Sequence, residues 1–282
     1  MSDVGAGRPP ALEPLPQPVV DNHCHLEMTL DGTEELAPER ALETAASVGV
    51  PRIVQIGCEL DSARWSVEVA DRVAGIVAGV SLHPNEAPRL AAAGRFEETW
   101  EEIEQLATRA CVRAVGETGL DHYRTGEEGW PAQERSFRLH IDLAKRLGKT
   151  LVIHDRDAHA DVLRVLDDEG APERVVMHCF SGDADFARAC LDRGAWLSFA
   201  GTVTFKNAQE LRDAALVVPR ERLLVETDAP FLTPVPHRGR PNASYLVPHT
   251  MRLLADVRGN DLGQLCGAVE ANTFAAYGGS WD

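Results

Sequence analysis

The sequence predicts a single domain with the fold of a parallel (β/α)8 TIM barrel. Short β-branched runs alternate with helical patterns eight times along the chain, which is the order typical of this barrel. The length of 282 residues also suits one such domain. A doubly wound open sheet is the alternative, because the number of strands does not prove closure. No G-x-G-x-x-G turn follows the first run, so dinucleotide binding is not favoured.

The β-branched runs are predicted to be strands, each followed by polar or turn residues. They span residues 19–25, 52–58, 76–82, 112–117, 150–154, 174–178, 195–199 and 223–228. Helical spacing of apolar residues between them predicts helices at 39–48, 96–109, 133–147, 158–168 and 183–192. Residues 1–18 are rich in Pro, Gly and Ala and are expected to form a disordered tail, so that the barrel occupies residues 19–282.

The chain is acidic, with 28 basic and 44 acidic residues and a net charge of −16. This balance argues against a broad basic surface for long nucleic acid or anionic membranes, although phosphate can still bind at metal ions. The six scattered cysteines form no C-x-x-C pair, which indicates reduced thiols. Neither an apolar stretch of ~20 residues nor a secretory signal is present, which predicts a cytoplasmic protein without a membrane partner. We expect a monomer.

The first predicted strand ends in an H-x-H motif. Asp21, His23 and His25 point to the same face, because side chains alternate along a strand. Two histidines placed in this way can bind one divalent metal ion through imidazole nitrogens. The motif alone is equally compatible with two ordinary histidines.

Ionisable residues also end four later strands. In a barrel the carboxyl ends of all strands surround one mouth, where active sites lie. Four histidines and two carboxylates are therefore expected to meet there: His23, His25, Glu117, His154, His178 and Asp228. Burying so many ionisable groups without partners would be costly, whereas two divalent cations would use them all. Glu117 is the natural bridge between the two ions, because none of the three lysines ends a strand.

Seven segments between residues 21 and 242 connect these strand ends to a known pattern: DNHCHL, VSLHP, VGETGLDHYR, IHDRDA, MHCFSG, ETDAPFL and HRGRPN. With these segments in this order, the chain resembles TatD-type metal-dependent deoxyribonucleases of the amidohydrolase-like superfamily. The resemblance implies one metal ion held by His23, His25, Glu117 and Asp228, and a second held by Glu117, His154 and His178. It also implies magnesium, manganese or zinc as the ions and DNA as the substrate, with 3′ to 5′ exonuclease action on DNA ends. The net charge of −16 favours short single strands as the DNA that is bound.

Three segments depart from the family pattern. Glu27 stands where Asp is usual, and Asn85 stands where a second His is common. The stretch R-G-K-x-N-E-P ends here in Ala243 and Ser244 instead of Glu and Pro. The last change bears on the shape of the substrate-binding loop, whereas the metal-ligand set is intact.

A water molecule activated by the two metals is the expected nucleophile, since a divalent ion can lower the pKa of bound water from 15.7 to about 7. Asp228 is expected to orient this water and accept its proton, beside the bridging Glu117. Arginine matches phosphate geometry with paired donors. The predicted substrate-binding residues are His83, Arg156, Arg238 and Arg240. His83 could instead pack under the mouth, and each arginine could equally be a solvated side chain.

Several other polar residues carry open alternatives. Glu226 is expected either to orient a metal-binding histidine or to pair with a buried arginine. Tyr123 could stack on a base, although an ordinary packed tyrosine is favoured. The remaining histidines are expected to face solvent: His122, His140, His159, His237 and His249.

Three functions fit these residues. The favoured one is a hydrolase that cleaves phosphodiester bonds of DNA. The alternative is a metal-dependent deacylase or amidase, for example a D-aminoacyl-tRNA deacylase, because the same activated water can attack a carbonyl group. A metal-binding protein without turnover is least favoured. Arginines at the mouth would favour phosphate, whereas an apolar pocket there would favour an acyl group.

Overall fold

A computed structural model describes residues 7–30, 36–279 and 281. Eight parallel strands form one sheet in chain order, each paired with the next. The strands are β1 (Val20–Cys24), β2 (Arg52–Gly57), β3 (Ile76–Val80), β4 (Val112–Asp121), β5 (Thr150–Arg156), β6 (Val175–Met177), β7 (Trp196–Phe199) and β8 (Leu223–Val225). A parallel bridge between Cys24 and Ala229 joins the first strand to the segment after the last. The barrel prediction is confirmed, and the open-sheet alternative is wrong.

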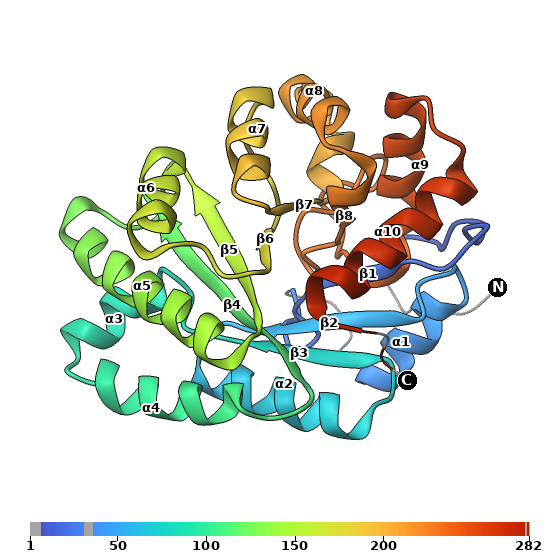
Figure 1. The fold of residues 1–282 in the computed structure, drawn as a ribbon. Coiled ribbons are helices and arrows are strands. Elements are labelled where there is room, and N and C mark those ends of the chain that lie inside the picture. Colours follow the sequence, from blue (N-terminus) through green and yellow to red (C-terminus); the bar gives the residue numbers. More distant parts are fainter. Residues whose placement is uncertain (1–6, 31–35, 280, 282) are drawn as a thin grey trace.

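The helices lie outside the strands (Figure 1). They are α1 (Pro38–Ala46), α2 (Leu60–Arg72), α3 (Glu86–Ala92), α4 (Phe96–Ala107), α5 (Trp130–Leu147), α6 (His159–Glu169), α7 (Ala184–Asp192), α8 (Gln209–Val217), α9 (Val247–Arg258) and α10 (Leu262–Tyr277). Their apolar faces and the outward strand residues form the largest core cluster. The five helices predicted from apolar spacing are α1, α4, α5, α6 and α7, with ends that differ by a few residues.

Strand β4 is longer than its predicted range of 112–117. Its last residues continue the parallel ladder, with Gly119 opposite His154 and Asp121 opposite Arg156. A Cβ atom at Gly119 would lie 2.1 Å from the His154 carbonyl oxygen, so this close approach needs glycine. The extension carries Asp121, which lies beyond the predicted range, into the strand that also bears Glu117.

The end of the chain closes the barrel opposite the mouth. Alternate inward residues of the strands form a second cluster with Tyr277 and Trp281. Thr150, the first residue of β5, donates a hydrogen bond of 2.5 Å to the Ala276 carbonyl oxygen. Arg52, at the start of β2, donates to the carbonyl oxygen of Trp281 at 3.0 Å. The carboxyl ends of the strands, on the opposite side of the barrel, are not covered in this way. Active sites of this fold lie at those ends.

Residues 7–18 differ from the expectation of a disordered tail. Leu15 is buried, and its amide donates to the Val48 carbonyl oxygen at 3.0 Å. The Tyr245 hydroxyl donates to the Pro9 carbonyl oxygen at 2.7 Å. Proline-rich backbone keeps free carbonyl acceptors, and the barrel supplies the donors. We call residues 7–18 the N-terminal arm. Residues 1–6 of the predicted tail lie outside the described residues.

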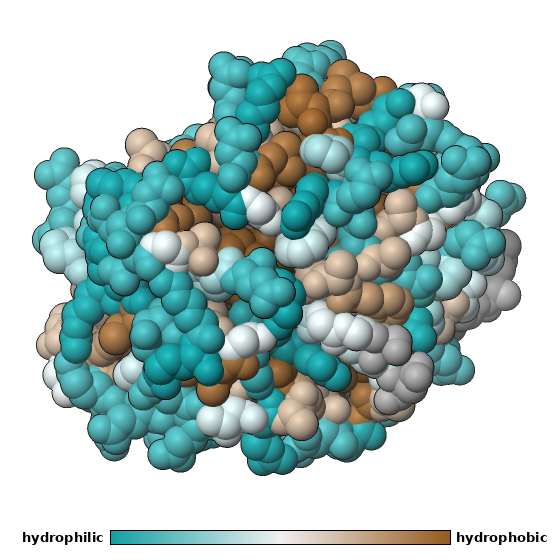
Figure 2. Space-filling model, in the orientation of Figure 1, coloured by the Kyte–Doolittle hydropathy of each residue, from teal (hydrophilic) through white to brown (hydrophobic). Residues whose placement is uncertain are grey.

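Hydrophilic residues cover most of the face shown in Figure 2, with apolar residues mainly in its hollows and over α8. Leu216 of that helix is 56% exposed. No helix in the described part of the chain is long and apolar enough to cross a membrane.

Candidate metal centre

The carboxylate of Glu117 lies at the centre of the barrel mouth, and each of its oxygens faces a different set of histidines. Oε2 lies 3.3 Å from His23 Nε2 and 3.7 Å from His25 Nε2. Oε1 lies 2.7 Å from His154 Nδ1 and 3.0 Å from His178 Nε2. A carboxylate shared in this way has the arrangement of a bridge between two cations.

Asp228 completes the first set. Its Oδ1 lies 3.4 Å from His25 Nε2 and 3.8 Å from His23 Nε2. The residue has φ 55°, a backbone conformation that aspartate adopts more readily than most side chains. Its amide donates to the His23 carbonyl oxygen at 2.9 Å. Asp21, expected on the metal face, instead accepts bonds from the Thr227 amide and hydroxyl at 2.8 and 2.6 Å and so fixes the segment that carries Asp228.

The second set is held by two further carboxylates. Glu226 accepts from the Cys179 amide at 2.8 Å and lies 3.0 Å from His178 Nδ1. This contact leaves His178 Nε2 directed at Glu117, which is the usual way to orient a metal-binding imidazole. Of the two alternatives for Glu226, the structure therefore shows the histidine partner. Asp121 Oδ2 lies 3.4 Å from His154 Nε2.

Electrostatics keeps the central carboxylates ionised. Burial alone would raise the pKa of Glu117, but His178, His83 and His154 outweigh it and lower the pKa well below its usual range. Burial is likewise outweighed at Asp228, whose pKa is lowered by His25 and His178. The centre therefore presents two anions among imidazoles, which is the donor chemistry that divalent cations such as zinc take.

Unsatisfied atoms test whether cations fit here. Both ring nitrogens of His23, Nε2 of His154 and Oε2 of Glu226 are buried and make no well-aligned hydrogen bond, although two of the nitrogens lie near the carboxylates of Glu117 and Asp121. Buried polar atoms are nearly always paired, so these atoms need a ligand. Three groups also hold their ligand atoms within 4.8 Å of one another: His23 with His25 and Glu117; His23 with His178 and Glu226; and His83 with Glu117 and His154. The residues fit a cluster of cations.

The predicted substrate-binding residues lie in different environments. His83 Nε2 is 3.3 Å from Glu117 Oε1, so His83 belongs to the cluster itself. Arg156 stacks over the Tyr123 ring at 4.0 Å, beside His154. Arg238 lies over the Phe205 ring at 4.0 Å. Arg240 donates to carbonyl oxygens of Gly7 and Arg8, so it holds the N-terminal arm.

Other expectations need correction. Tyr123 is not an ordinary packed tyrosine, because it is 66% exposed. His140 is fully buried and not solvent-facing; its Nε2 accepts from the Leu82 amide at 3.1 Å. Asp121 was not predicted to contact the cluster, although its spacing of four residues from Glu117 places both on one strand face. Cys58, whose thiol lies 3.4 Å from Glu117 Oε2, gave no signal in the sequence.

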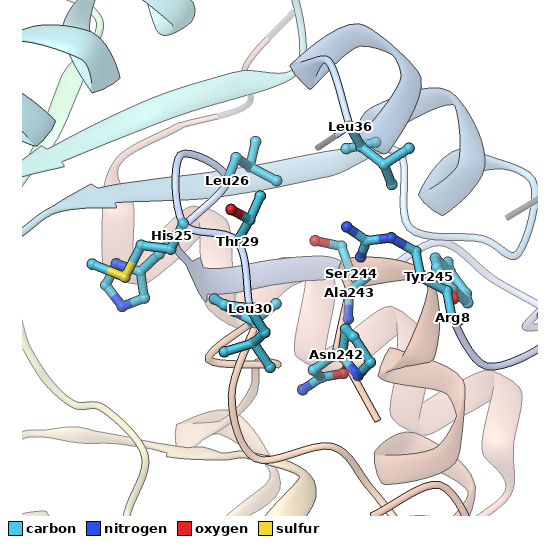
Figure 3. A pocket seen from close by; sticks show the side chains of 15 residues that line it. Arg8, His25, Leu26, Thr29, Leu30, Leu36, Asn242, Ala243, Ser244 and Tyr245 are labelled. Atoms are coloured by element: carbon cyan, nitrogen blue, oxygen red, sulfur yellow. The ribbon is translucent and has the colours of Figure 1, made fainter. Parts of the chain in front are cut away.

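A pocket opens beside His25 (Figure 3). Its walls include Leu26, Leu30 and Leu36 on one side and Asn242 to Tyr245 on the other. Arg8 of the N-terminal arm reaches into it from the side opposite His25. The empty volume, counted with the solvent at its opening, is about 510 Å³.

Comparison with known proteins agrees with this geometry. The family model of TatD related DNases matches residues 20–278. The chain belongs to the TatD-related DNase family. The uncharacterized metal-dependent hydrolase TatD of Mycobacterium tuberculosis is 45% identical over 268 residues, covering 93% of this chain and 99% of the relative. The metal-dependent hydrolase YcfH of Escherichia coli is 36% identical over 258 residues, covering 91% and 94%.

A solved structure extends the comparison to the whole barrel. The TatD homologue YjjV of Escherichia coli superposes with a TM-score of 0.81 at 26% identity, covering 92% of this chain and 97% of that one. This TatD family chain is therefore a metal-dependent hydrolase that uses divalent metal. The matched region begins at residue 20, so the N-terminal arm lies outside it.

Proposed function

We propose that this protein cleaves phosphodiester bonds of DNA with two bound metal ions. The observation that carries the proposal is the double use of Glu117, whose two oxygens face two separate sets of imidazoles. His23, His25, Glu117 and Asp228 would hold one ion, and Glu117, His154 and His178 the other. When bound, magnesium, manganese or zinc would lower the pKa of a water molecule and stabilise charge on the phosphate oxygens.

Asp228 is the proposed proton acceptor. Its side chain is 15% exposed, whereas those of Glu117 and Glu226 are 5% and 0% exposed. Asp228 is therefore the carboxylate of this group that reaches toward incoming substrate and water. A carboxylate held ionised at neutral pH can orient a water molecule and take its proton.

Tyr123 and Arg156 are the proposed contacts with the nucleotide. The guanidinium covers one face of the exposed ring, which fixes the ring and supplies positive charge beside His154. The other ring face can stack on a base, an interaction worth about 1–3 kcal/mol. The end of a DNA strand suits this single stacking site, because a DNA end needs few contacts beyond the mouth. We therefore propose exonucleolytic action. The 3′ to 5′ direction is what the family resemblance implies, and we propose a monomer as the acting form.

The deacylase alternative has one observation in its favour. The pocket beside His25 has leucine walls, which would suit an acyl group. Arg156 at the mouth favours a phosphate instead. We therefore keep DNA as the first candidate and aminoacyl-tRNA as the second.

The deciding experiment offers both substrates to the same metal-loaded protein. End-labelled single-stranded DNA should be shortened stepwise from its 3′ end, and D-aminoacyl-tRNA should remain intact. The Asp228→Asn variant, purified and loaded with metal in the same way, serves as the control for contaminating nucleases. Release of the amino acid without DNA degradation would replace the nuclease by the deacylase.

A further inference from the structure

The turn that carries Asp228 is held by one buried amide side chain from the segment that follows β8. Asn242 Nδ2 donates to the Thr227 carbonyl oxygen at 2.9 Å and to the Phe231 carbonyl oxygen at 2.6 Å. The backbone amide of Asn242 donates to the Pro230 carbonyl oxygen at 3.0 Å. Asn242 is 1% exposed, so these bonds form away from competing water. A single residue therefore bonds to the backbone on both sides of Asp228.

The backbone of Asp228 needs such support. Its φ of 55° lies in the left-handed region, and the Phe231 amide donates to its carbonyl oxygen at 2.9 Å, which closes a tight turn. A residue other than glycine keeps this conformation only where its surroundings fix it. Asp21 of β1 fixes the turn from the barrel through the amide and hydroxyl of Thr227. Asn242 fixes the same turn from the segment beyond it.

Residues 7–9 of the N-terminal arm bond to the chain on both sides of Asn242. The Arg240 guanidinium, two residues before Asn242, donates to the carbonyl oxygens of the first two of these residues. The Tyr245 hydroxyl, three residues after Asn242, donates to the Pro9 carbonyl oxygen at 2.7 Å. The arm therefore holds the loop that carries Asn242 at two points.

These contacts are additional to those of the shared barrel. The arm lies outside the region that the family model matches, which begins at residue 20. In the pattern R-G-K-x-N-E-P, Asn242 is the asparagine, and Arg240 stands in the place of the lysine. A guanidinium has a rigid fork of donors that can serve two carbonyl oxygens, whereas an ammonium group is a compact point charge. This chain thus combines the arm with the side chain type that suits it.

We propose that Asn242 is a positioning residue for Asp228. The N-terminal arm holds Asn242 in place through Arg240 and Tyr245. The inference rests on the proposed role of Asp228 as metal ligand and proton acceptor, and it names the residues that place this carboxylate. A misplacement of about 1 Å, caused by a change away from the chemistry, can cost about 10²-fold in rate. Loosening the turn should therefore lower kcat and leave KM nearly unchanged.

Asn242→Ala tests the contact with the turn. The variant loses both side-chain bonds, so kcat should fall by about 10-fold or more at a KM within about 2-fold of the wild type. Kinetics use the substrate that the wild type cleaves, DNA or aminoacyl-tRNA, because both candidate reactions use Asp228. Affinity for Mn²⁺ should fall for one of two ions, since Asp228 belongs to one set of ligands. A raised KM at unchanged kcat would make Asn242, which lines the pocket beside His25, a substrate contact and overturn the inference.

Tyr245→Phe and Arg240→Gln test the contact with the arm. Each variant removes one of the two points of attachment and should lower kcat by about 2- to 5-fold. Arg240→Lys keeps a donor and should retain part of the lost rate. In the background of Asn242→Ala neither change should lower kcat further, because the arm acts through Asn242. Fully additive losses would show that the arm acts by another route and overturn this part of the inference.

Arg252→Gln is the matched control. Arg252 also holds the arm, but at the carbonyl oxygens of Glu13 and Pro14, so kcat and Mn²⁺ affinity should equal those of the wild type. Urea unfolding is measured for every variant. A loss of stability in Asn242→Ala without any change in kcat or Mn²⁺ affinity of the folded protein would mean a merely structural role and overturn the inference.

Metal affinity keeps this inference separate from the proposed function. If the wild type cleaves neither DNA nor aminoacyl-tRNA, the proposed function fails, and Mn²⁺ titrations decide the inference alone. Weaker binding of one ion in Asn242→Ala and in Tyr245→Phe, but not in Arg252→Gln, would then support it. Equal Mn²⁺ affinity in all of these proteins would overturn it.

Discussion

At the scale of single residues, Glu117 shows how one carboxylate organises the whole mouth. It extends from β4 between two groups of imidazoles, and its charge is stabilised by both. Each of two further carboxylates contacts one group: Asp228 contacts His25, and Glu226 contacts His178. Removing either peripheral carboxylate would affect one set, whereas removing Glu117 affects both.

Metal content should therefore depend on Glu117 more than on any other acid. Protein reconstituted with Mn²⁺ should hold close to two ions per chain, and Glu117→Ala should hold one or fewer because the shared ligand is lost. Elemental analysis of desalted protein measures this, with circular dichroism to check folding. Glu68→Ala changes an exposed glutamate in the middle of the outer helix α2 and should keep two ions. Wild-type protein without metal after reconstitution would contradict the two-metal proposal.

Asp228→Asn separates chemistry from metal binding. Asparagine keeps the size of the side chain but cannot accept the proton, so activity should fall by at least ~10²-fold. The rate of DNA shortening is measured at saturating metal, with occupancy determined on the same sample. Near wild-type turnover at full occupancy would mean that another group accepts the proton.

His140 should make stability depend on pH. Burial lowers its pKa to about 4, and its neutral form is fixed by Ser136 O at 2.7 Å and the Leu82 amide at 3.1 Å. The unfolded chain binds a proton near pH 6.5, so stability is full above that pH and falls as pH drops toward 4, by about 3 kcal/mol. Urea unfolding at several pH values should show a shallower acid loss in His140→Gln. Identical pH dependence in both proteins would refute this role.

At the scale of elements, the strands could be predicted well because the eight apolar runs are each followed by polar or turn residues. The seven shorter strands lie within their predicted ranges or within two residues of them. The extension of β4 could not be predicted, since it depends on Gly119 approaching β5. The docking of the N-terminal arm was also missed, because its bonds use backbone carbonyls that composition does not reveal. In the mouth, His83 and Asp121 contact the cluster because closure of the barrel brings their strands together. These distances cannot be obtained from the sequence.

The seam between β1 and β8 depends on one buried side chain. Asn22 donates to Ser198 Oγ at 3.1 Å and to the Val225 carbonyl oxygen, and its own oxygen accepts from the Tyr277 hydroxyl at 3.2 Å. Asn22→Ala leaves these buried groups without a partner and should lower the free energy of unfolding by about 2 kcal/mol. Urea denaturation measures the change. Asn207→Ala, an exposed site, should change stability by less than ~0.5 kcal/mol; an equal loss in both variants would contradict the seam's role.

At the scale of the whole molecule, charge and shape act in opposite directions on a nucleic acid. The surface carries most of the net charge of −16 and repels a phosphate backbone. The mouth gathers the metal-binding cluster and Arg156, which attract it. Attraction is therefore confined to a few phosphates at one end of the barrel.

This confinement predicts a shallow salt dependence. If two or three phosphates are engaged, the logarithm of affinity for a short single strand should fall against the logarithm of salt concentration with a slope near −2, at roughly −0.7 per phosphate. Binding of labelled oligonucleotides at rising KCl, with an Asp228→Asn variant to prevent turnover, gives this slope. Oligonucleotides of increasing length should bind with the same slope, because added phosphates extend past the mouth over an acidic surface. A slope steeper than about −5, or efficient cutting of closed circular DNA, would instead require an extended cationic track outside the mouth. Such a track is what the excess of 44 acidic over 28 basic residues argues against.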